Sequence, residues 1–186
     1  MIRHVVDYKN PILKEKMPAF DFLNPIMDPI ELYTDLAETM RDQDGIGLSA
    51  NQIGIRTRAF VMRAEEIIGV FNPRIVDVSD ETIYLEEGCL SYRNLFVKIK
   101  RPKSIRVRFT HPDGKTETRE FDGMTARCFQ HELDHLDGII FTRRAHSVHL
   151  NQARKIAKKM NRKYGLLKPK GELSQEAKDM MEWLKA

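Results

Sequence analysis

Five consecutive residues, His131-Glu132-Leu133-Asp134-His135, constrain the fold of this chain more than any other segment. They form an H-E-x-x-H pattern. Residues four apart lie on one face of an α-helix, so both imidazoles can reach one metal ion. Glu132 would then act as general base on a water at the metal without being a ligand. The alternative is a surface helix that contains these residues by chance, because five residues make a short pattern.

A catalytic metal usually has three protein ligands and one open position, so the pattern requires a third ligand. The zinc-protease pattern H-E-x-x-H-x-x-G-x-x-H is not completed here, because Phe141 stands where its last histidine belongs. A downstream carboxylate ligand is also disfavoured, since the first acidic residue after Asp137 is Glu172. The third ligand must therefore be sought among other side chains.

The two cysteines are the remaining candidates. Cys128 and His135 lie about 10 Å apart along a helix axis, too far for one ion to bind both. We therefore expect Cys128 to be a small buried residue. Cys89 lies far enough away in the sequence to fold back over the helix, and Gly88 permits a close backbone approach. An ordinary strand-end thiol is the alternative, but we predict that Cys89, His131 and His135 bind the metal.

The chain is long enough for one domain, with 186 residues of which 41% are hydrophobic and 31% charged. No apolar stretch approaches the roughly 20 residues of a membrane span. The first residues also lack the apolar segment of a signal peptide. These features predict a cytoplasmic protein with reduced thiols and no membrane contact.

The expected elements are helical at both ends and β-rich between them. A helix begins at Pro29, with Asp28 as N-cap, and ends before Gly45. The expected strands are residues 59–62, 69–72, 75–78, 82–85, 104–109 and 116–121, with a turn at 111–114 before the last strand. Helices are expected at about 125–137, 149–164 and 174–184. This order predicts an α+β domain over residues 1–165, followed by an extension at 166–186. Antiparallel sheets would pack around the central H-E-x-x-H helix, with an N-terminal helix and a C-terminal basic helix.

Three segments resemble the signature motifs of peptide deformylases, in the same order and with similar spacing. They are Gly45-Ile46-Gly47-Leu48-Ser49-Ala50-Asn51-Gln52, Glu87-Gly88-Cys89-Leu90-Ser91 and the segment from Gln130 to Gly138. The resemblance extends over roughly residues 5–165. It implies an enzyme that hydrolyses the N-formyl group from the formyl-methionine of nascent polypeptides and releases formate.

The resemblance also implies roles for single residues. Glu132 would take a proton from the water at the metal and later pass one to the leaving amine. The oxyanion would be stabilised by the metal, the Leu90 backbone N–H and the Gln52 side-chain amide. The cofactor would be one divalent ion, with Fe²⁺ favoured and Zn²⁺ or Ni²⁺ also able to bind. Its ligands would be Cys89, His131 and His135.

Four positions match substrate-binding residues of the family. The backbone around Ile46 and Gly47 would pair with the peptide as an added strand. Ile46, Leu85 and Cys128 match positions that line the methionine pocket. Plain core packing is the alternative interpretation of Ile46 and Leu85.

Asp134 would support the ligands, with Arg101 as a partner, unless it is exposed to solvent. The chain also departs from the family pattern at two places. Ser49 replaces the usual Ala; it is small, and we expect little effect. The segment Tyr92-Arg93-Asn94 lacks the usual proline after the cysteine motif, although Asn94 can adopt a left-handed conformation and keep a turn.

Positive charge is concentrated near the C-terminal end. Between Arg143 and Lys170 there are ten Lys or Arg residues and no Asp or Glu, leaving 21 basic and 27 acidic residues elsewhere. A solvated charged face is one interpretation of the basic helix, and contact with ribosomal RNA is the other. Ile156, Ala157 and Met160 mark a narrow apolar face for docking. Nothing predicts sequence-specific nucleic-acid binding.

Two other functions are compatible with these residues. One is a metallohydrolase of the same fold that acts on another N-acyl peptide or amide. The other is a non-enzymatic, metal-stabilised binding protein. The presence of Gln52, Gly47 and Glu132 disfavours the second, as does the lack of a fourth ligand to close a structural zinc site.

Overall fold

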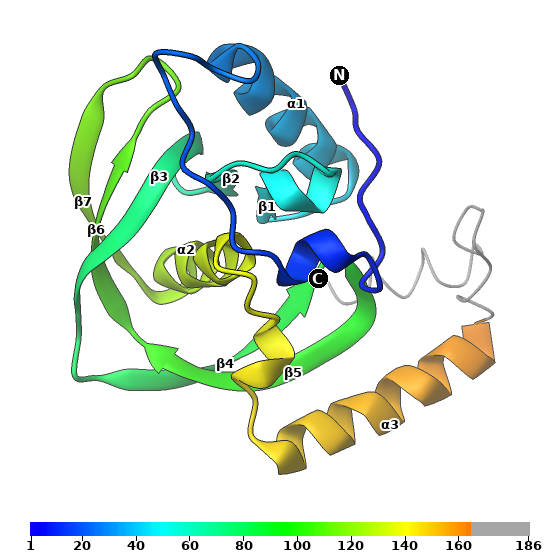
Figure 1. Ribbon diagram of the computed structural model, residues 1–186. Helices are drawn as coiled ribbons and strands as arrows, with labels where there is room; N and C mark the ends of the chain where they lie inside the picture. Colours follow the sequence, from blue (N-terminus) through cyan, green and yellow to red (C-terminus); the bar gives the residue numbers. More distant parts are fainter. Residues whose placement is uncertain (165–186) are drawn as a thin grey trace.

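A central helix, α2 (Gly123–Leu136), lies inside a shell of strands in the computed structural model, which describes residues 1–164 (Figure 1). The larger sheet is antiparallel, with strand order β1-β2-β3-β6-β7. Its strands are β1 (Gly47–Ser49), β2 (Ala59–Arg63), β3 (Ile67–Val78), β6 (Ser104–Thr110) and β7 (Thr116–Asp122). The smaller sheet is the antiparallel pair β4 (Thr82–Cys89) and β5 (Tyr92–Pro102). The α+β architecture predicted from the sequence is confirmed.

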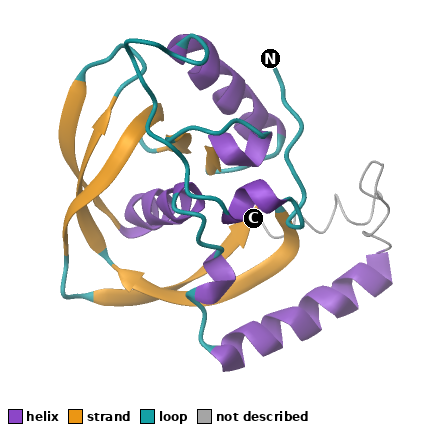
Figure 2. Ribbon diagram, viewed as in Figure 1, coloured by secondary structure: helices purple, strands orange, loops and turns teal. Residues whose placement is uncertain are grey.

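The helices outside the shell cover its ends (Figure 2). Helix α1 (Pro29–Asp42) packs against β1 and β2, and α3 (Ser147–Tyr164) packs against β5. Asp28 caps α1 as predicted, since its side chain accepts hydrogen bonds from the backbone N–H groups of Ile30 and Glu31. Short 3₁₀ helices η1 (Pro11–Lys14), η2 (Ala50–Ile53) and η3 (Phe141–Arg143) connect the larger elements.

One side of α2 is held in the apolar core of the larger sheet. Phe129 is fully buried, and its ring packs edge-on against Phe60 of β2 at a centroid distance of 5.1 Å. It also contacts Phe121 of β7 at 5.8 Å. Burying an aromatic side chain of this size contributes on the order of 2–3 kcal/mol. This contact fixes the rotation of α2 and so directs its histidines away from the larger sheet.

The end of α2 is also fixed, as predicted, by Gly138. This residue has φ +69°, and the backbone N–H of Ile139 donates to Asp134 O at 2.8 Å in a left-handed helix cap. A Cβ at position 138 would lie 2.6 Å from the backbone oxygen of Lys14. Only glycine therefore lets the N-terminal segment approach the end of the helix that carries the site.

The structure corrects several sequence-based expectations. Strand β5 was not predicted, and neither was the short edge strand β1. The two strands expected at 69–72 and 75–78 are one strand, β3, with a bulge where Asn72 has φ +49°. The expected helix at 174–184 lies outside the described residues, as does the extension after residue 165.

The docking face predicted for the basic helix is also wrong in part. Ile156 is 62% exposed, so it does not dock on the domain. Leu150 and Ala153 pack instead against Val97 and Ile99 of β5. The apolar face lies about one turn earlier on α3 than expected, because the strand that it covers was not foreseen.

Among residues 1–164, no helix has both the length and the apolar character to cross a membrane.

Candidate metal centre and active site

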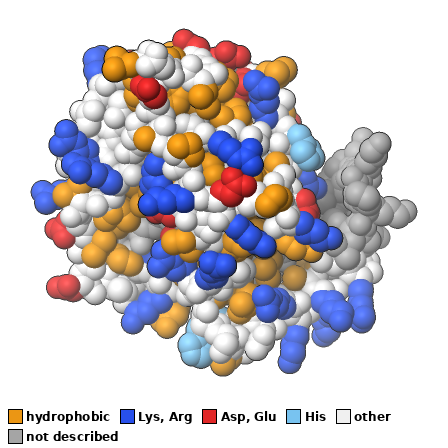
Figure 3. Space-filling model, in the orientation of Figure 1, with side chains coloured by type: hydrophobic (Ala, Val, Ile, Leu, Met, Phe, Trp, Pro, Cys, Tyr) orange, Lys and Arg blue, Asp and Glu red, His pale blue; other side chains and the backbone are white. Residues whose placement is uncertain are grey.

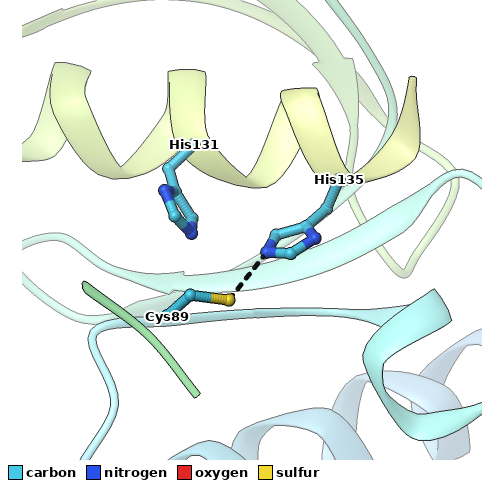
Figure 4. Close-up of side chains that lie close together, drawn as sticks. All are labelled: Cys89, His131 and His135. Atoms are coloured by element: carbon cyan, nitrogen blue, oxygen red, sulfur yellow. Dashed lines mark hydrogen bonds between the residues drawn. The ribbon is translucent and has the colours of Figure 1, made fainter. Parts of the chain in front are cut away.

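Three side chains from two elements converge at the open side of α2 (Figure 4). His131 and His135 project from one face of the helix, and Cys89 lies at the end of β4. Their ligand atoms all lie within 4.8 Å of one another, and Cys89 Sγ is 3.2 Å from His135 Nε2. Metal–ligand bonds of about 2.0–2.3 Å fit one ion between such atoms. Within the described part of the chain, no other three His, Cys, Asp or Glu residues are grouped in this way.

His131 is oriented by a buried carboxylate. Its Nδ1 lies 3.0 Å from Glu87 Oε2, which leaves Nε2 to face Cys89. Glu87 also accepts hydrogen bonds from Arg101 at 2.6 and 2.8 Å and from Arg127 at 2.8 Å. Burial would raise the pKa of Glu87, but the hydrogen bonds from Arg101 and His131 outweigh it and hold that pKa well below its usual range. The ionised Glu87 therefore fixes the His131 ring for ligation.

Asp134 extends this network behind the helix. It is 5% exposed, and its carboxylate accepts a hydrogen bond from Arg101 at 2.7 Å. Arg144 approaches the same carboxylate from the far side, at 2.7 and 3.2 Å. The predicted pairing of Asp134 with Arg101 is confirmed, and a solvent-exposed Asp134 is excluded.

His135 lies in a different environment. Its backbone oxygen accepts a hydrogen bond from Asn51 Nδ2 at 2.7 Å. Its Nδ1 is buried and has no hydrogen-bond partner among residues 1–164. Burial lowers the pKa of His135 well below its ordinary value, with the positive charges of His131 and Arg101 acting in the same direction. The ring is thus held neutral, the form that binds a metal.

Glu132 lies beside the metal-site histidines, and no Lys or Arg within residues 1–164 forms an ion pair with it. It is 3% exposed, and its Oε2 has no hydrogen-bond partner within residues 1–164. Burial raises the pKa of Glu132 to about 7, against the opposing charge of His131 and a hydrogen bond with Ser49. A Cβ on Gly47 would lie 2.5 Å from Glu132 Oε1, so glycine there lets β1 contact the carboxylate directly. A buried carboxyl group with this pKa can both accept and return a proton near neutrality.

Gln52 and Leu90 lie next to Cys89. The Nε2 of Gln52 points to Cys89 Sγ at 3.5 Å and donates to Ser91 Oγ at 3.2 Å. Its Oε1 accepts a hydrogen bond from the Ser49 backbone N–H at 3.0 Å. Leu90 is half-buried and lies in the turn directly after Cys89. The amide of Gln52 is therefore presented to the site with its donor side forward.

Three of the four predicted substrate residues, Ile46, Gly47 and Cys128, lie together beside Glu132. Ile46 is 48% exposed, and its backbone oxygen accepts a hydrogen bond from the Cys128 thiol at 3.3 Å. Cys128 is 3% exposed, as expected for a packing residue, and burial raises the pKa of its thiol. Gly47 lies over both Cys128 and Glu132. Leu85 is half-buried on β4, two residues before Glu87 on the same face of the strand.

The turn after Cys89 lies at residues 90–91, and Asn94 lies in the strand β5 that follows it. Asn94 has φ +64°, as anticipated for a left-handed residue. Its Nδ2 donates to Asn161 Oδ1 of α3 at 3.0 Å, so a tertiary contact holds this end of β5. The Tyr92 ring packs against Tyr8 and Phe141 at centroid distances of 5.3 and 5.5 Å.

Sequence reasoning missed the part played by Glu87. A usable signal was present, because Glu87 lies two residues before Cys89 on a strand, and metal-binding histidines commonly donate to a carboxylate. Arg127 was missed as well. It lies four residues before His131 on α2, which places its side chain over the same part of β4.

The fold and this site define a hydrolase of the H-E-x-x-H class, with a Cys/His₂ donor set fit for one metal ion. A sequence model of the polypeptide deformylase family matches residues 2–151. A peptide deformylase of a Wolbachia from Brugia malayi is 40% identical over 148 residues, which cover 72% of this chain and 83% of that protein. That of Natranaerobius thermophilus is 41% identical over 150 residues, covering 79% and 94%.

Solved structures agree with the sequence relatives. A peptide deformylase from Legionella pneumophila has a TM-score of 0.78 at 28% identity, covering 91% of this chain and 100% of that chain. The enzyme from Thermotoga maritima has a TM-score of 0.75 at 34% identity, covering 78% and 99%. This chain belongs to the peptide deformylase family. It is a hydrolase that removes the N-formyl group from nascent polypeptides, as the sequence motifs predicted.

Proposed function

We propose that this chain deformylates N-terminal formyl-methionine with Cys89, His131 and His135 as metal ligands and Glu132 as the proton-transfer residue. The observation that carries this assignment is the convergence of the three ligand atoms beside a buried carboxylate whose pKa is raised to about 7. A metal at this site supplies a water of lowered pKa and polarises the formyl oxygen. Glu132 removes the proton from the attacking water and passes it to the leaving amine nitrogen.

Two neutral donors complete the proposed catalytic group. The Gln52 amide Nε2 and the Leu90 backbone N–H donate to the oxyanion that forms when the formyl carbon is attacked. Gln52 Nε2 is already directed at the Cys89 side of the site. Such donors are most effective when they are held in place before the reaction.

The substrate binds, in this proposal, along β1. This strand lies at the edge of the larger sheet, so the backbone around Ile46 and Gly47 can pair with an extended peptide. Ile46, Leu85 and Cys128 line an apolar pocket for the methionine side chain. Main-chain pairing suits an enzyme that must accept many nascent sequences, because it does not depend on the following side chains.

The metal proposed for the site is Fe²⁺, and Zn²⁺ and Ni²⁺ also suit the Cys/His₂ donors. Element analysis of protein purified without oxygen tests this assignment. About one iron per chain is expected. A full complement of another metal together with full activity would contradict it.

The direct test of the proposed function is formate release from a formyl-Met peptide by the metal-loaded protein. Glu132→Gln keeps the size of the side chain but cannot accept the proton, so kcat should fall by about 10³-fold with unchanged metal content. No formate from the wild type would overturn the activity on this substrate. Equal rates from both proteins at equal metal content would overturn the role of Glu132.

Contact with the ribosome is proposed for α3. Its Arg154, Lys155, Lys158, Lys159, Arg162 and Lys163 side chains are all exposed, and Lys and Arg gather along this edge in Figure 3. Such a surface suits RNA phosphates and would place the enzyme near emerging chains in the cytoplasm. Cosedimentation with ribosomes should weaken steeply as salt is raised. Binding that is absent at low salt, or equal at low and high salt, would contradict this contact.

A further inference from the structure

Ser49 lies between the oxyanion donor Gln52 and the helix that carries the metal ligands. Its side chain is fully buried at the junction of β1 and η2. Its Oγ is 2.9 Å from Gln52 Oε1 and 2.8 Å from Asn51 Oδ1. Both neighbours are amide carbonyl oxygens, which only accept hydrogen bonds. The carboxylate of Glu132 is a third acceptor within reach of the Ser49 hydroxyl, so its one proton is shared among the three neighbours.

Residue 49 fixes which side of the Gln52 amide faces the site. The Ser49 backbone N–H donates to Gln52 Oε1 at 3.0 Å, and the hydroxyl approaches the same oxygen. With its oxygen held in this way, the amide directs Nε2 at Cys89 Sγ. An amide turned over about its last bond would present an acceptor to the developing oxyanion. That arrangement would destabilise the transition state instead of stabilising it.

The second partner of the hydroxyl connects Ser49 to α2. Asn51 donates through Nδ2 to the backbone oxygen of His135 at 2.7 Å, which turns its Oδ1 toward Ser49. A methyl group at position 49 would remove the hydroxyl donor from Asn51 Oδ1. It would also leave Gln52 Oε1 with only the backbone donor of residue 49. A buried acceptor left with fewer donors destabilises the arrangement that it belongs to.

We propose that the Ser49 hydroxyl is a positioning group that holds Gln52 in its donating orientation. The inference rests on the proposed function, because it requires Gln52 to stabilise the oxyanion. It also gives a role to the residue by which this chain departs from the usual alanine of its family. An expectation based on size alone assigns Ser49 little effect, since it overlooks the hydroxyl.

A double-mutant cycle on the full-length, metal-loaded protein tests this inference. The variants are Ser49→Ala, Gln52→Leu and the double variant, each measured for kcat, KM and metal content with a formyl-Met peptide. Gln52→Leu should lower kcat by about 10²–10³-fold. Ser49→Ala should lower kcat by about five- to tenfold, with KM and metal content within about twofold of the wild type. In the Gln52→Leu background, removing the hydroxyl should change kcat by less than about twofold.

The outcomes separate this inference from the proposed function. The same loss of kcat in both backgrounds would overturn a role of Ser49 through Gln52. A loss of activity that parallels a loss of metal would overturn it too, because the effect would then pass through Asn51 to His135. If Gln52→Leu keeps full activity while the wild type releases formate, the oxyanion role fails and the deformylase activity stands.

Thr39→Val is the matched control for a lost buried hydroxyl. Thr39 is fully buried on α1, and its Oγ1 donates to the backbone oxygen of Asp35 at 2.7 Å. This variant should melt at a lower temperature than the wild type and keep its kcat. If the kcat of Thr39→Val falls by the same factor as that of Ser49→Ala, loss of Gln52 positioning is not the cause of the lower kcat.

Discussion

Two glutamates at this site are buried to the same extent but lie in opposite electrostatic surroundings. Glu87 on β4 is 4% exposed, and Glu132 on α2 is 3% exposed. Arg101 and Arg127 donate to Glu87, and its pKa lies well below the ordinary value. Among residues 1–164, no arginine donates to Glu132, and burial raises its pKa to about 7. Burial acts upward on both pKa values; at Glu132 it sets the shift, whereas at Glu87 the hydrogen-bonding partners reverse it.

The difference assigns separate tasks to the two carboxylates. Glu87 stays ionised throughout the pH range of a folded enzyme, so it is a fixed acceptor that orients His131. Glu132 changes its protonation state near neutrality, which a group that accepts and then returns a proton must do. In the proposed mechanism the charged network would orient His131, and the less polar pocket would supply the proton transfer.

The largest stability effect should come from removing the charge of Glu87. In Glu87→Gln, Arg101 and Arg127 lose their shared buried counter-charge, so the free energy of unfolding should fall by about 3–5 kcal/mol. Metal affinity should fall by about 10–100-fold, because His131 loses its ionised partner. Chemical denaturation and metal titration measure the two effects.

The matched control for this change is Glu86→Gln. Glu86 is the preceding residue of β4, is exposed and faces the other side of the strand. The Glu86→Gln variant should have a free energy of unfolding within about 0.5 kcal/mol of the wild type and an unchanged metal affinity. Comparable losses in both variants would show that the network around Glu87 has no special role.

A smaller stability effect should separate the two glutamates by pH. The pKa of Glu132 rises from 4.5 to about 7 on folding. Its contribution to the stability of chelator-treated protein is therefore present below pH 4.5 and lost as the pH rises through 7. The Glu132→Gln variant has no carboxyl group at this position, so its stability does not fall in this way. The free energy of unfolding of Glu132→Gln should therefore increase relative to that of the wild type by about 3 kcal/mol between pH 4.5 and 8.

Thermal melting in a chelator measures this difference. The melting temperature of Glu132→Gln should rise by several degrees relative to the wild type across that pH range. A constant difference at all pH values would mean that Glu132 is ionised in the folded protein, as Glu87 is. The contrast between the two pockets would then be lost.

The smallest of these effects should follow from crowding the Glu132 pocket. In Gly47→Ala, the added Cβ would lie 2.5 Å from Glu132 Oε1 and 2.7 Å from Cys128 Sγ, so the carboxylate must move. A displacement of this kind should lower kcat by about tenfold or more. Metal content should not change, because no ligand is touched. Unchanged kcat would show that the position of Glu132 tolerates such a shift.

The sequence predicted the central helix and the convergence of Cys89, His131 and His135, because the spacing of the histidines is local and chemically strict. His131 and His135 share a helix face by periodicity alone, and elimination left Cys89 as the third ligand. Asp28 and Gly138 predicted helix ends because caps depend on a few adjacent residues. The motif order then predicted the family, which the relatives confirm.

The features that the sequence did not predict depend on contacts between residues that are distant in the chain. Strand β5 was overlooked although Val97 and Ile99 are buried and Lys98 and Lys100 are exposed, an alternation typical of a strand. Its basic residues and the Arg93-Asn94 break masked the pattern. Without β5, the docking side of α3 could not be predicted. The Arg127 contact with Glu87 spans 40 positions, a pairing that no local pattern indicates.

The opposite states of the two glutamates can be measured directly by NMR titration of protein with ¹³C-labelled glutamate carboxyl groups, kept in a chelator. We predict one buried carboxyl signal that titrates near pH 7 and disappears in Glu132→Gln. A second buried signal, lost in Glu87→Gln, should stay ionised down to the pH at which the protein unfolds. If both signals titrate together near pH 4, or if the signal near pH 7 belongs to Glu87, the division of tasks between the two carboxylates is wrong.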